Sequence, residues 1–135
     1  MASYWLWGDI IRKNVILDSS AIIMCFEFSI DLEKELARIL GSFDIVVPST
    51  VVKELDFLSK EGKGVKKIKA KASLKLIEKY EIIGVDGNNA DDSLIRLAKI
   101  INGIVVTNDK DLRKRLKEVF VPVVFLRSKK KLILE

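Results

Sequence analysis

The 135-residue sequence predicts an α/β fold, in which a mainly parallel sheet of about five strands is covered by helices on both faces. Short apolar runs rich in β-branched residues alternate along the chain with longer segments whose apolar residues recur at helical spacing. Hydrophobic residues make up 49% of the chain and only two prolines interrupt it, which suits the core of one domain over residues 1–135. No stretch has the length of a membrane-spanning helix, so we expect no membrane partner.

The predicted strands are short runs of Val, Ile and Leu, as expected for strands that helices bury on both faces. The second of them is closed by Pro48, which is a poor residue for the interior of a sheet. In chain order the strands are predicted at residues 15–17, 45–47, 82–85, 104–107 and 121–126, with a short edge strand at 132–134 after a lysine turn.

The predicted helices are recognised by their apolar spacing and by the residues at their ends. Gly41 ends one helix, Ser49 or Thr50 caps the next, and a turn at residues 86–89 leads into a helix that ends near Asn102. In chain order the helices are predicted at residues 31–40, from the cap to about 59, at 66–80, from the turn to about 102, and at 111–119.

Four acidic residues stand beside apolar runs in this pattern. Asp18 follows the first strand and Asp109 the fourth, so both are predicted at the carboxyl edge of the sheet, where such folds bind ligands. Glu54 borders the apolar stripe of its helix, and Asp91 is in helical register with the apolar residues of its own. Carboxylates in such places are costly unless a cation balances them, and a divalent cation is the obvious candidate.

Each acid taken alone has a simpler interpretation. Asp18 can cap a helix beginning at Ala21, Glu54 can reach water from the edge of its stripe, and acids such as Asp91 are favoured in a first helical turn. Asp92 is predicted to face outward or sideways, in a supporting role. The metal interpretation therefore depends on the set and not on one member.

The residues around the last strand–helix junction fit the same interpretation. We expect one of Asp109 and Asp111 to cap the next helix while the other binds metal. The hydroxyls of Ser20 and Thr107 are placed to hydrogen-bond to the carboxylates and fix their orientation. Mg²⁺ or Mn²⁺, which prefer oxygen ligands, would relieve the repulsion and support displacement at phosphorus.

The chain contains no histidine and a single cysteine, Cys25. Histidine-dependent hydrolases, histidine- or cysteine-ligated zinc sites and internal disulfides are therefore excluded. A reducing, cytoplasmic setting is the default expectation.

The charges that sum to a net +5 are unevenly distributed along the chain. Residues 60–79 carry eight lysines against two glutamates, and residues 110–131 carry nine Lys or Arg against two acids. A basic periphery around an acidic remainder suits a protein that holds a phosphate backbone, although lysine-rich solvated surfaces are also typical of stable proteins. The candidate phosphate contacts are Lys63, Lys66, Lys67, Arg113, Lys114 and Arg115.

Around the four acidic residues the sequence resembles the PIN domain, a superfamily of metal-dependent nucleases that includes toxin ribonucleases and ribosomal-RNA processing factors. The ordered motifs span nearly the whole chain: Leu17-Asp18-Ser19-Ser20, Glu54, Ala90-Asp91-Asp92 and Thr107-Asn108-Asp109-Lys110-Asp111-Leu112. Ser20 departs from the family, where many members have Asn.

The resemblance implies a three-layer α/β/α sandwich, Mg²⁺ or Mn²⁺, and cleavage of single-stranded RNA. It implies a metal-binding catalytic quartet of Asp18, Glu54, Asp91 and Asp109, with Asp111 as an accessory ligand. Residues 90–94 and 121–127 are similar to the archaeal and eukaryotic rRNA-processing branch.

Other interpretations remain open. A toxin-type ribonuclease or a non-catalytic RNA-binding or assembly protein would share the fold, whereas haloacid-dehalogenase phosphatases and receiver domains need acids that this chain lacks. A homodimer, a protein inhibitor and a ribosome-assembly partner stay open as partners. The apolar segment around Trp5, Leu6 and Trp7 is expected to pack on the fold or on a partner subunit.

Overall fold

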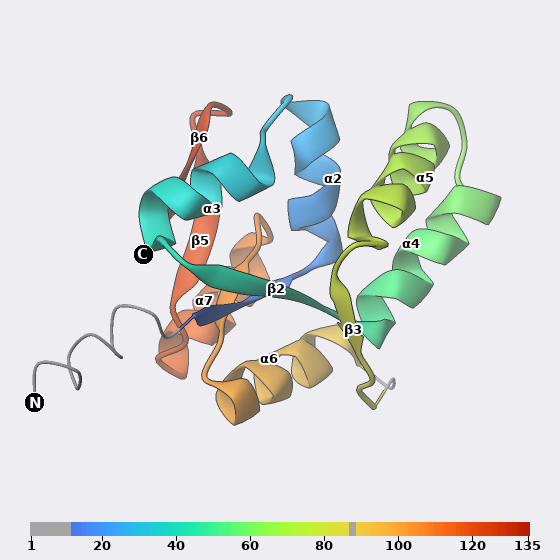
Figure 1. The fold of residues 1–135 in the computed structure, drawn as a ribbon. Coiled ribbons are helices and arrows are strands. Elements are labelled where there is room, and N and C mark those ends of the chain that lie inside the picture. The colour runs from blue at the N-terminus through green and yellow to red at the C-terminus, as the bar shows by residue number, and fades with distance from the viewer. Residues whose placement is uncertain (1–11, 87–88) are drawn as a thin grey trace, which may run out of the picture.

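The structure, a computed structural model, describes residues 12–86 and 89–135 and is built on a six-stranded sheet in the order β3-β2-β1-β4-β5-β6 (Figure 1). Strands β1 to β5 pair in parallel, and β6 is antiparallel to β5. The α/β prediction is confirmed, with one strand more than about five because the short run after the lysine turn does form β6. The strands are β1 (Lys13–Leu17), β2 (Phe43–Pro48), β3 (Glu81–Ile83), β4 (Ile104–Val106), β5 (Val123–Arg127) and β6 (Lys131–Leu134).

Helices cover both faces of the sheet and give the three layers of an α/β/α sandwich (Figure 1). Helices α2 to α5 lie on one face, where α5 packs against α4 and α2, while α6 and α7 lie on the other. None of the helices in the described residues is long and apolar enough to cross a membrane. The helices are α2 (Ser19–Glu27), α3 (Leu32–Leu40), α4 (Ser49–Glu61), α5 (Val65–Ile77), α6 (Ala90–Ile101) and α7 (Lys110–Glu118).

Strand β1 shows why the central strands are apolar at every position. Val15 and Leu17 point into the core beneath α2–α5, whereas Ile16 points into the core beneath α6 and α7. All three side chains are fully buried. Alternate residues of a strand face opposite sides, so a strand with helices on both sides has no face for polar residues.

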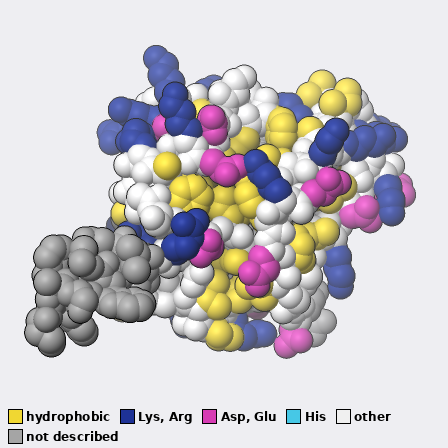
Figure 2. Space-filling view, in the orientation of Figure 1, with side chains coloured by type: hydrophobic (Ala, Val, Ile, Leu, Met, Phe, Trp, Pro, Cys, Tyr) yellow, Lys and Arg dark blue, Asp and Glu magenta, His cyan; other side chains and the backbone are white. Residues whose placement is uncertain are grey.

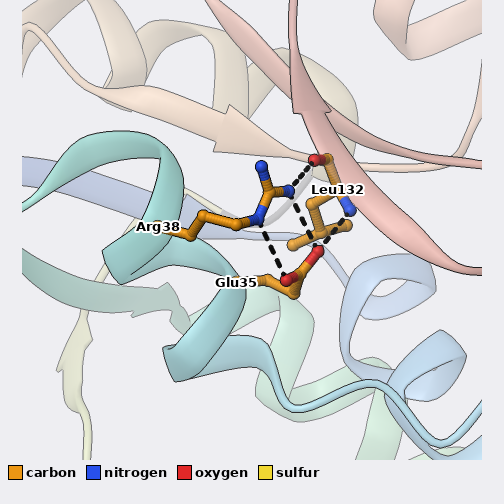
Figure 3. Close-up of polar contacts among 3 residues, drawn as sticks. All are labelled: Glu35, Arg38 and Leu132. Carbon is orange, nitrogen blue, oxygen red and sulfur yellow. Dashed lines mark hydrogen bonds and ion pairs between the residues drawn. The ribbon is translucent and has the colours of Figure 1, made fainter.

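Helix α3 covers the edge of the sheet formed by β6. The backbone N–H of Leu132 on β6 donates to Glu35 Oε1 (2.9 Å), and Arg38 Nη2 donates to the Leu132 carbonyl (2.7 Å) (Figure 3). Glu35 and Arg38 also form an ion pair with each other. These side chains satisfy backbone groups that would otherwise be free to pair with a strand of another chain.

Some predicted element ends are wrong. Helix α4 has Pro48 at its N-cap with no capping side chain, because Ser49 Oγ instead accepts a hydrogen bond from the Val85 backbone N–H. Helix α5 ends at Ile77, before the predicted 80, and Tyr80, beyond its end, donates its hydroxyl to Glu33. Gly87, Asn88 and the segment containing Trp5, Leu6 and Trp7 lie outside the described residues.

Candidate active site

The predicted acids meet at the carboxyl edge of the sheet, where the strand order reverses. From β1 the chain continues to β2 and β3 on one side, and it later returns to place β4 on the other. Leu17 at the end of β1 pairs with Val106 at the end of β4, so the residues that follow, Asp18 and Thr107, are neighbours. This reversal point is where open α/β sheets bind ligands.

Asp18 is the most deeply buried of the acids, with 8% of its surface exposed. Its Oδ1 accepts hydrogen bonds from the Ala21 backbone N–H (2.8 Å) and from Ser20 Oγ (2.8 Å), and its Oδ2 accepts one from Thr107 Oγ1. Asp18 therefore caps α2, as its simpler interpretation predicts, and also lines the pocket described below. The two roles are compatible because a carboxylate has more acceptor sites than one cap requires.

The two hydroxyls that the sequence places near the carboxylates do bond to Asp18, and both extend the network. Ser20 Oγ accepts a hydrogen bond from the Asn108 backbone N–H (3.1 Å), and Thr107 Oγ1 accepts one from the Asp109 backbone N–H (3.1 Å). The ends of β1 and β4 are thus joined through side chains as well as through the sheet. The orientation of the Asp18 carboxylate is fixed by this network.

Glu54 reaches the same region from α4. Its side chain is exposed and its Oε2 accepts a hydrogen bond from Ser19 Oγ (2.9 Å) on α2. On either side of Glu54 in the sequence, Val51 and Leu55 of α4 are buried. Glu54 therefore lies at the border of the apolar stripe of α4, as the helical spacing predicts.

Helix α6 separates its two adjacent acids. Asp91 is half-buried and lines the pocket, whereas Asp92 forms an ion pair with Arg115 on α7. Asp92 does face away from the core, but its partner comes from α7 and not from its own helix. The Arg115 side chain is therefore engaged within the protein.

The expectation that one of Asp109 and Asp111 caps the next helix is confirmed for Asp109, whereas the metal ligand among them stays a prediction. Asp109 both caps α7, accepting from the Leu112 backbone N–H (3.0 Å), and lines the pocket. Asp111 lies exposed in the first turn of α7 and is not among the residues that line the pocket. One carboxylate can do both because the cap uses only Oδ1.

A single pocket of about 340 Å³ brings the four acids together. Each comes from a different part of the fold: the end of β1, α4, α6 and the end of β4. Apolar side chains of α2, α4 and α6 form the rest of the walls, together with one lysine. The lining residues are Asp18, Ser19, Ser20, Ile23, Val51, Glu54, Leu58, Lys66, Ala90, Asp91, Leu94 and Asp109.

The electrostatics of the pocket disfavour its negative charge. Burial raises the pKa of Asp18 to about 6, against the lowering effect of its three hydrogen bonds, and Asp109 adds a smaller upward push. Burial also raises the pKa of Asp91, and the nearby Asp109 and Glu54 carboxylates act in the same direction. None of the four forms an ion pair with another described residue.

The donor set fits a hard divalent cation. Carboxylate oxygens are the ligands that Mg²⁺ and Mn²⁺ prefer, and a cation would offset the mutual repulsion of the four acids. Within residues 12–86 and 89–135, however, no three acidic or cysteine side chains lie close enough as they stand to hold one ion. The four carboxylates thus surround the pocket without forming a closed ligand set.

The six candidate phosphate contacts are not equivalent. Lys66 on α5 lines the pocket beside the acids. Arg113 stacks on the Phe125 ring (3.5 Å to the centroid) and lies 3.3 Å from Glu135, and Arg115 is paired with Asp92. The other three, Lys63, Lys67 and Lys114, lie in the α4–α5 loop, on α5 and on α7.

Figure 2 shows Lys and Arg side chains gathered over α4 and α5 and around the β5–β6 turn on this face of the molecule. The two predicted basic segments therefore both contribute to the periphery. Of the candidate contacts, only Lys66 brings its positive charge to the lining of the acidic pocket.

Two polar residues at the site were not assigned roles by the sequence reasoning. Ser19 donates to Glu54, and Asn108 fastens three elements: its Nδ2 donates to Met24 Sδ (3.0 Å), and its Oδ1 accepts from the Leu126 backbone N–H (3.0 Å). Asn108 stands in the segment that follows β4. This position could have indicated a role for Asn108, because residues that directly follow central strands of α/β sheets often line the ligand-binding site.

Sequence comparisons agree with this architecture. The family described as PIN like domain matches residues 15–129. Ribonuclease VapC4 of Methanocaldococcus jannaschii is 34% identical over 121 residues, covering 87% of this chain and 92% of the relative. Ribonuclease VapC9 of Archaeoglobus fulgidus is 28% identical over 123 residues, covering 91% and 90%. The expectation that the rRNA-processing branch is nearest is not confirmed, because both curated relatives are named VapC ribonucleases.

Solved structures share the fold. The PIN domain endonuclease Utp24 superposes with a TM-score of 0.75 at 25% identity, covering 90% of each chain. VapBC2 from Rickettsia felis, solved with a DNA fragment, superposes with a TM-score of 0.61 at 18% identity over 84% of this chain and 99% of that one, which is a likeness of fold alone. Since the family match spans residues 15–129, and thus all four acids at the carboxyl edge of the sheet, the chain belongs to the PIN-like domain family.

Proposed function

We propose that this protein is a metal-dependent endoribonuclease that cleaves single-stranded RNA, with Mg²⁺ or Mn²⁺ held by Asp18, Glu54, Asp91 and Asp109. The observation that carries the proposal is that these four carboxylates, from four separated stretches of sequence, line one pocket with no ion pair to a described residue. Beyond the two helix caps, such a cluster is costly to the fold, because Asp109 raises the cost of ionising Asp18, and Asp109 and Glu54 raise that of Asp91. Such clusters are typical of functional sites.

Each residue has a defined contribution in this proposal. Asp18 presents a carboxylate whose direction is set by three hydrogen-bond donors, so little reorganisation accompanies cation binding. Glu54 and Asp109 are exposed at the rim and can turn towards a cation. A bound Mg²⁺ or Mn²⁺ supplies activation of water and stabilisation of the charge that develops at phosphorus.

Lys66 supplies a positive charge beside the acids. It lies on α5 at the pocket wall, where it can bind a phosphate next to the one that is cleaved. An RNA strand therefore meets a cation-binding pocket and a fixed lysine at once. RNA as the substrate is supported by both curated relatives, which are named ribonucleases.

The biological target has two candidate classes, rRNA precursors and the RNAs cut by toxin-type ribonucleases. Residues 90–94 and 121–127 resemble the rRNA-processing branch, whereas the curated relatives carry the name VapC. Crosslinking the inactive Asp18→Asn variant to RNA in cells and sequencing the bound fragments separates the classes. Enrichment of rRNA precursors favours processing, and enrichment of tRNA or mRNA favours toxin-type cleavage.

Cleavage itself is tested with an end-labelled single-stranded RNA and Mn²⁺, Mg²⁺ or a chelator. We expect cleavage with either metal, none with the chelator, and losses of two or more orders of magnitude in Asp18→Asn and Asp91→Asn. Asp56→Asn is the control for the loss of an acid, because Asp56 lies on α4 two residues from Glu54 but pairs with Lys60 and does not line the pocket. Undiminished cleavage in both pocket variants would overturn the proposal.

A further inference from the structure

Phe120 is an exposed aromatic residue at the end of α7 that the fold does not use. Its side chain is 93% exposed, and its backbone has a φ of 61°, in the left-handed region that favours glycine. Its N–H donates to the Lys117 carbonyl (3.1 Å), while the Val121 N–H donates to the Leu116 carbonyl (3.0 Å). This is a Schellman ending, in which the left-handed position is usually Gly or Asn.

Neither packing nor backbone geometry accounts for a phenylalanine at this position. The buried side chains at this helix end are Leu116 and Val121, which enclose the turn without help from Phe120. A bulky residue with positive φ costs stability relative to glycine. An exposed aromatic side chain on a strained backbone is a candidate for a contact with another molecule.

The outer face of α7 connects Phe120 with the active site. Lys110, Lys114 and Lys117 recur at intervals of four and three residues, so they share one helix face, and Lys110 directly follows the pocket residue Asp109. These three lysines line one surface hollow with Arg113 and Glu135. A second hollow, which shares Lys117 and Glu135 with the first, is lined by Phe120, Val121, Pro122 and Val123.

The charges along this face favour a polyanion. Among the described residues, Lys110 and Lys114 form no ion pair, and Lys117 lies 3.6 Å from Glu135 with 76% of its side chain exposed. The Glu135 carboxylate is shared between Lys117 and Arg113, so it neutralises only part of the face. A row of lysines that ends in an exposed aromatic ring is the arrangement by which proteins hold single-stranded nucleic acid, with cations on phosphates and a ring stacked on a base.

We propose that the outer face of α7 binds the RNA strand that leaves the active site, with Lys110, Lys114 and Lys117 on successive phosphates and Phe120 stacked on a base. This track rests on the proposed function, since it positions RNA at the same acidic pocket. From Asp109 to Phe120 the helix rise spans about 16 Å, so the track holds a few nucleotides beyond the cleaved bond. It gives the enzyme a preference for strands long enough to reach Phe120.

The aromatic part of the track is tested by binding, with cleavage blocked by Asp18→Asn and a chelator. Phe120→Leu keeps an apolar side chain but removes the ring, and Phe120→Trp keeps the ring. We expect Phe120→Leu to weaken binding of a single-stranded RNA of about twelve nucleotides by about 5- to 100-fold and to leave an RNA of about four nucleotides nearly unaffected when that short RNA occupies the pocket. Phe120→Trp should retain binding, and its added fluorescence should be quenched by the longer RNA.

The lysines are tested with a matched pair of charge reversals. Lys114→Glu lies on the track, whereas Lys34→Glu lies on α3 on the opposite face of the sheet. We expect Lys114→Glu to weaken binding of the longer RNA and to reduce the slope of log affinity against log salt by about 0.7 or more, with no change in Lys34→Glu.

Equal affinity of Phe120→Leu and of the otherwise identical protein with Phe120 for the longer RNA would overturn the track. If sedimentation changes while RNA binding does not, this face is instead a contact between copies of the chain. A wrong proposed function would give a different result, because the unmodified protein would then show no metal-dependent cleavage of RNA, independently of any substitution at Phe120.

Discussion

Thr107 donates a hydrogen bond from its hydroxyl to Oδ2 of Asp18 and so joins the ends of β4 and β1 at the floor of the acidic pocket. The same Oγ1 accepts the backbone N–H of Asp109. Thr107 is fully buried, and its position directly after β4 leaves its hydroxyl no access to water. One side chain thus sets the orientation of one pocket acid and the backbone of another.

The Thr107 hydroxyl can be tested with a nearly isosteric change. Thr107→Val should lower the free energy of unfolding by about 1 to 3 kcal/mol, because it leaves the buried Asp18 Oδ2 and the Asp109 N–H without their partner. It should also slow Mn²⁺-dependent cleavage. Urea unfolding measures the first effect, and Thr107→Ser, which keeps the hydroxyl, should recover most of both. A Thr107→Val protein as stable and active as the parent would show that the hydrogen bond is dispensable.

The raised pKa of Asp18 gives the metal-free protein a specific pH dependence. Because burial raises the pKa to about 6 in the folded state, against about 3.8 unfolded, the folded protein binds more protons within that window. The free energy of unfolding should therefore fall as pH rises through the window, by about 3 kcal/mol from this residue. This contribution of Asp18 to stability should be lost completely at pH values above the pKa that Asp18 has in the folded protein.

The Asp18→Asn variant isolates this contribution. Unfolding in urea with a chelator, from about pH 4 to about pH 8, should give a flatter pH profile for the variant. The difference in the free energy of unfolding between the two proteins should shift in favour of the variant as pH rises. Parallel profiles for the two proteins would mean that Asp18 titrates as an ordinary exposed carboxyl.

Arg113 is predicted to act mainly on stability. Its guanidinium stacks on Phe125 and lies beside Glu135, with 25% of the side chain exposed. Arg113→Ala should raise the free energy of the folded state by about 1 to 2 kcal/mol through loss of stacking and packing, and Arg113→Lys should not restore it. Thermal unfolding compares these with Lys114→Ala, for which a change below about 0.5 kcal/mol is expected.

Lys66 is predicted to act on RNA binding and not on stability. Lys66→Ala should weaken binding of single-stranded RNA and lower the salt dependence of log affinity by about 0.7, the contribution of one phosphate contact. Lys60→Ala is the control, because Lys60 pairs with Asp56 on α4 and does not line the pocket. Equal effects of the two changes would point to the net charge of the α4–α5 region and not to the pocket lysine.

Apart from α2, which the sequence indicated only through a possible helix cap at Asp18, the order of strands and helices could be predicted because local patterns determine it. The runs around Val15, Val46 and Val105 are apolar at each position, as expected for a sheet covered on both faces. The ends were less predictable where distant residues compete for a local group. Ser49 is an ordinary capping residue by sequence, but its hydroxyl is bonded to the Val85 backbone, a partner that only the folded chain brings near.

The candidate site could likewise be predicted where local sequence determines it and not where distant residues meet. Asp18, Glu54, Asp91 and Asp109 could be predicted to converge because strand ends and helix faces are readable from spacing. The engagement of Arg115 by Asp92 could not be predicted, since it depends on how α6 and α7 pack together. The double role of Asp109 was also missed, because spacing does not show whether a capping carboxylate has a second oxygen free for another partner.

A calorimetric Mn²⁺ titration of Asp109→Asn and Asp111→Asn beside the unmodified protein tests the metal centre most directly. The two acids lie on the same helix end, but of these two only Asp109 lines the pocket, and Asn at position 109 can still cap α7. We expect the unmodified protein and Asp111→Asn to bind Mn²⁺, with Asp109→Asn binding at least about tenfold more weakly. Mn²⁺ binding by Asp109→Asn as tight as that of the unmodified protein would contradict a metal centre built on these four carboxylates.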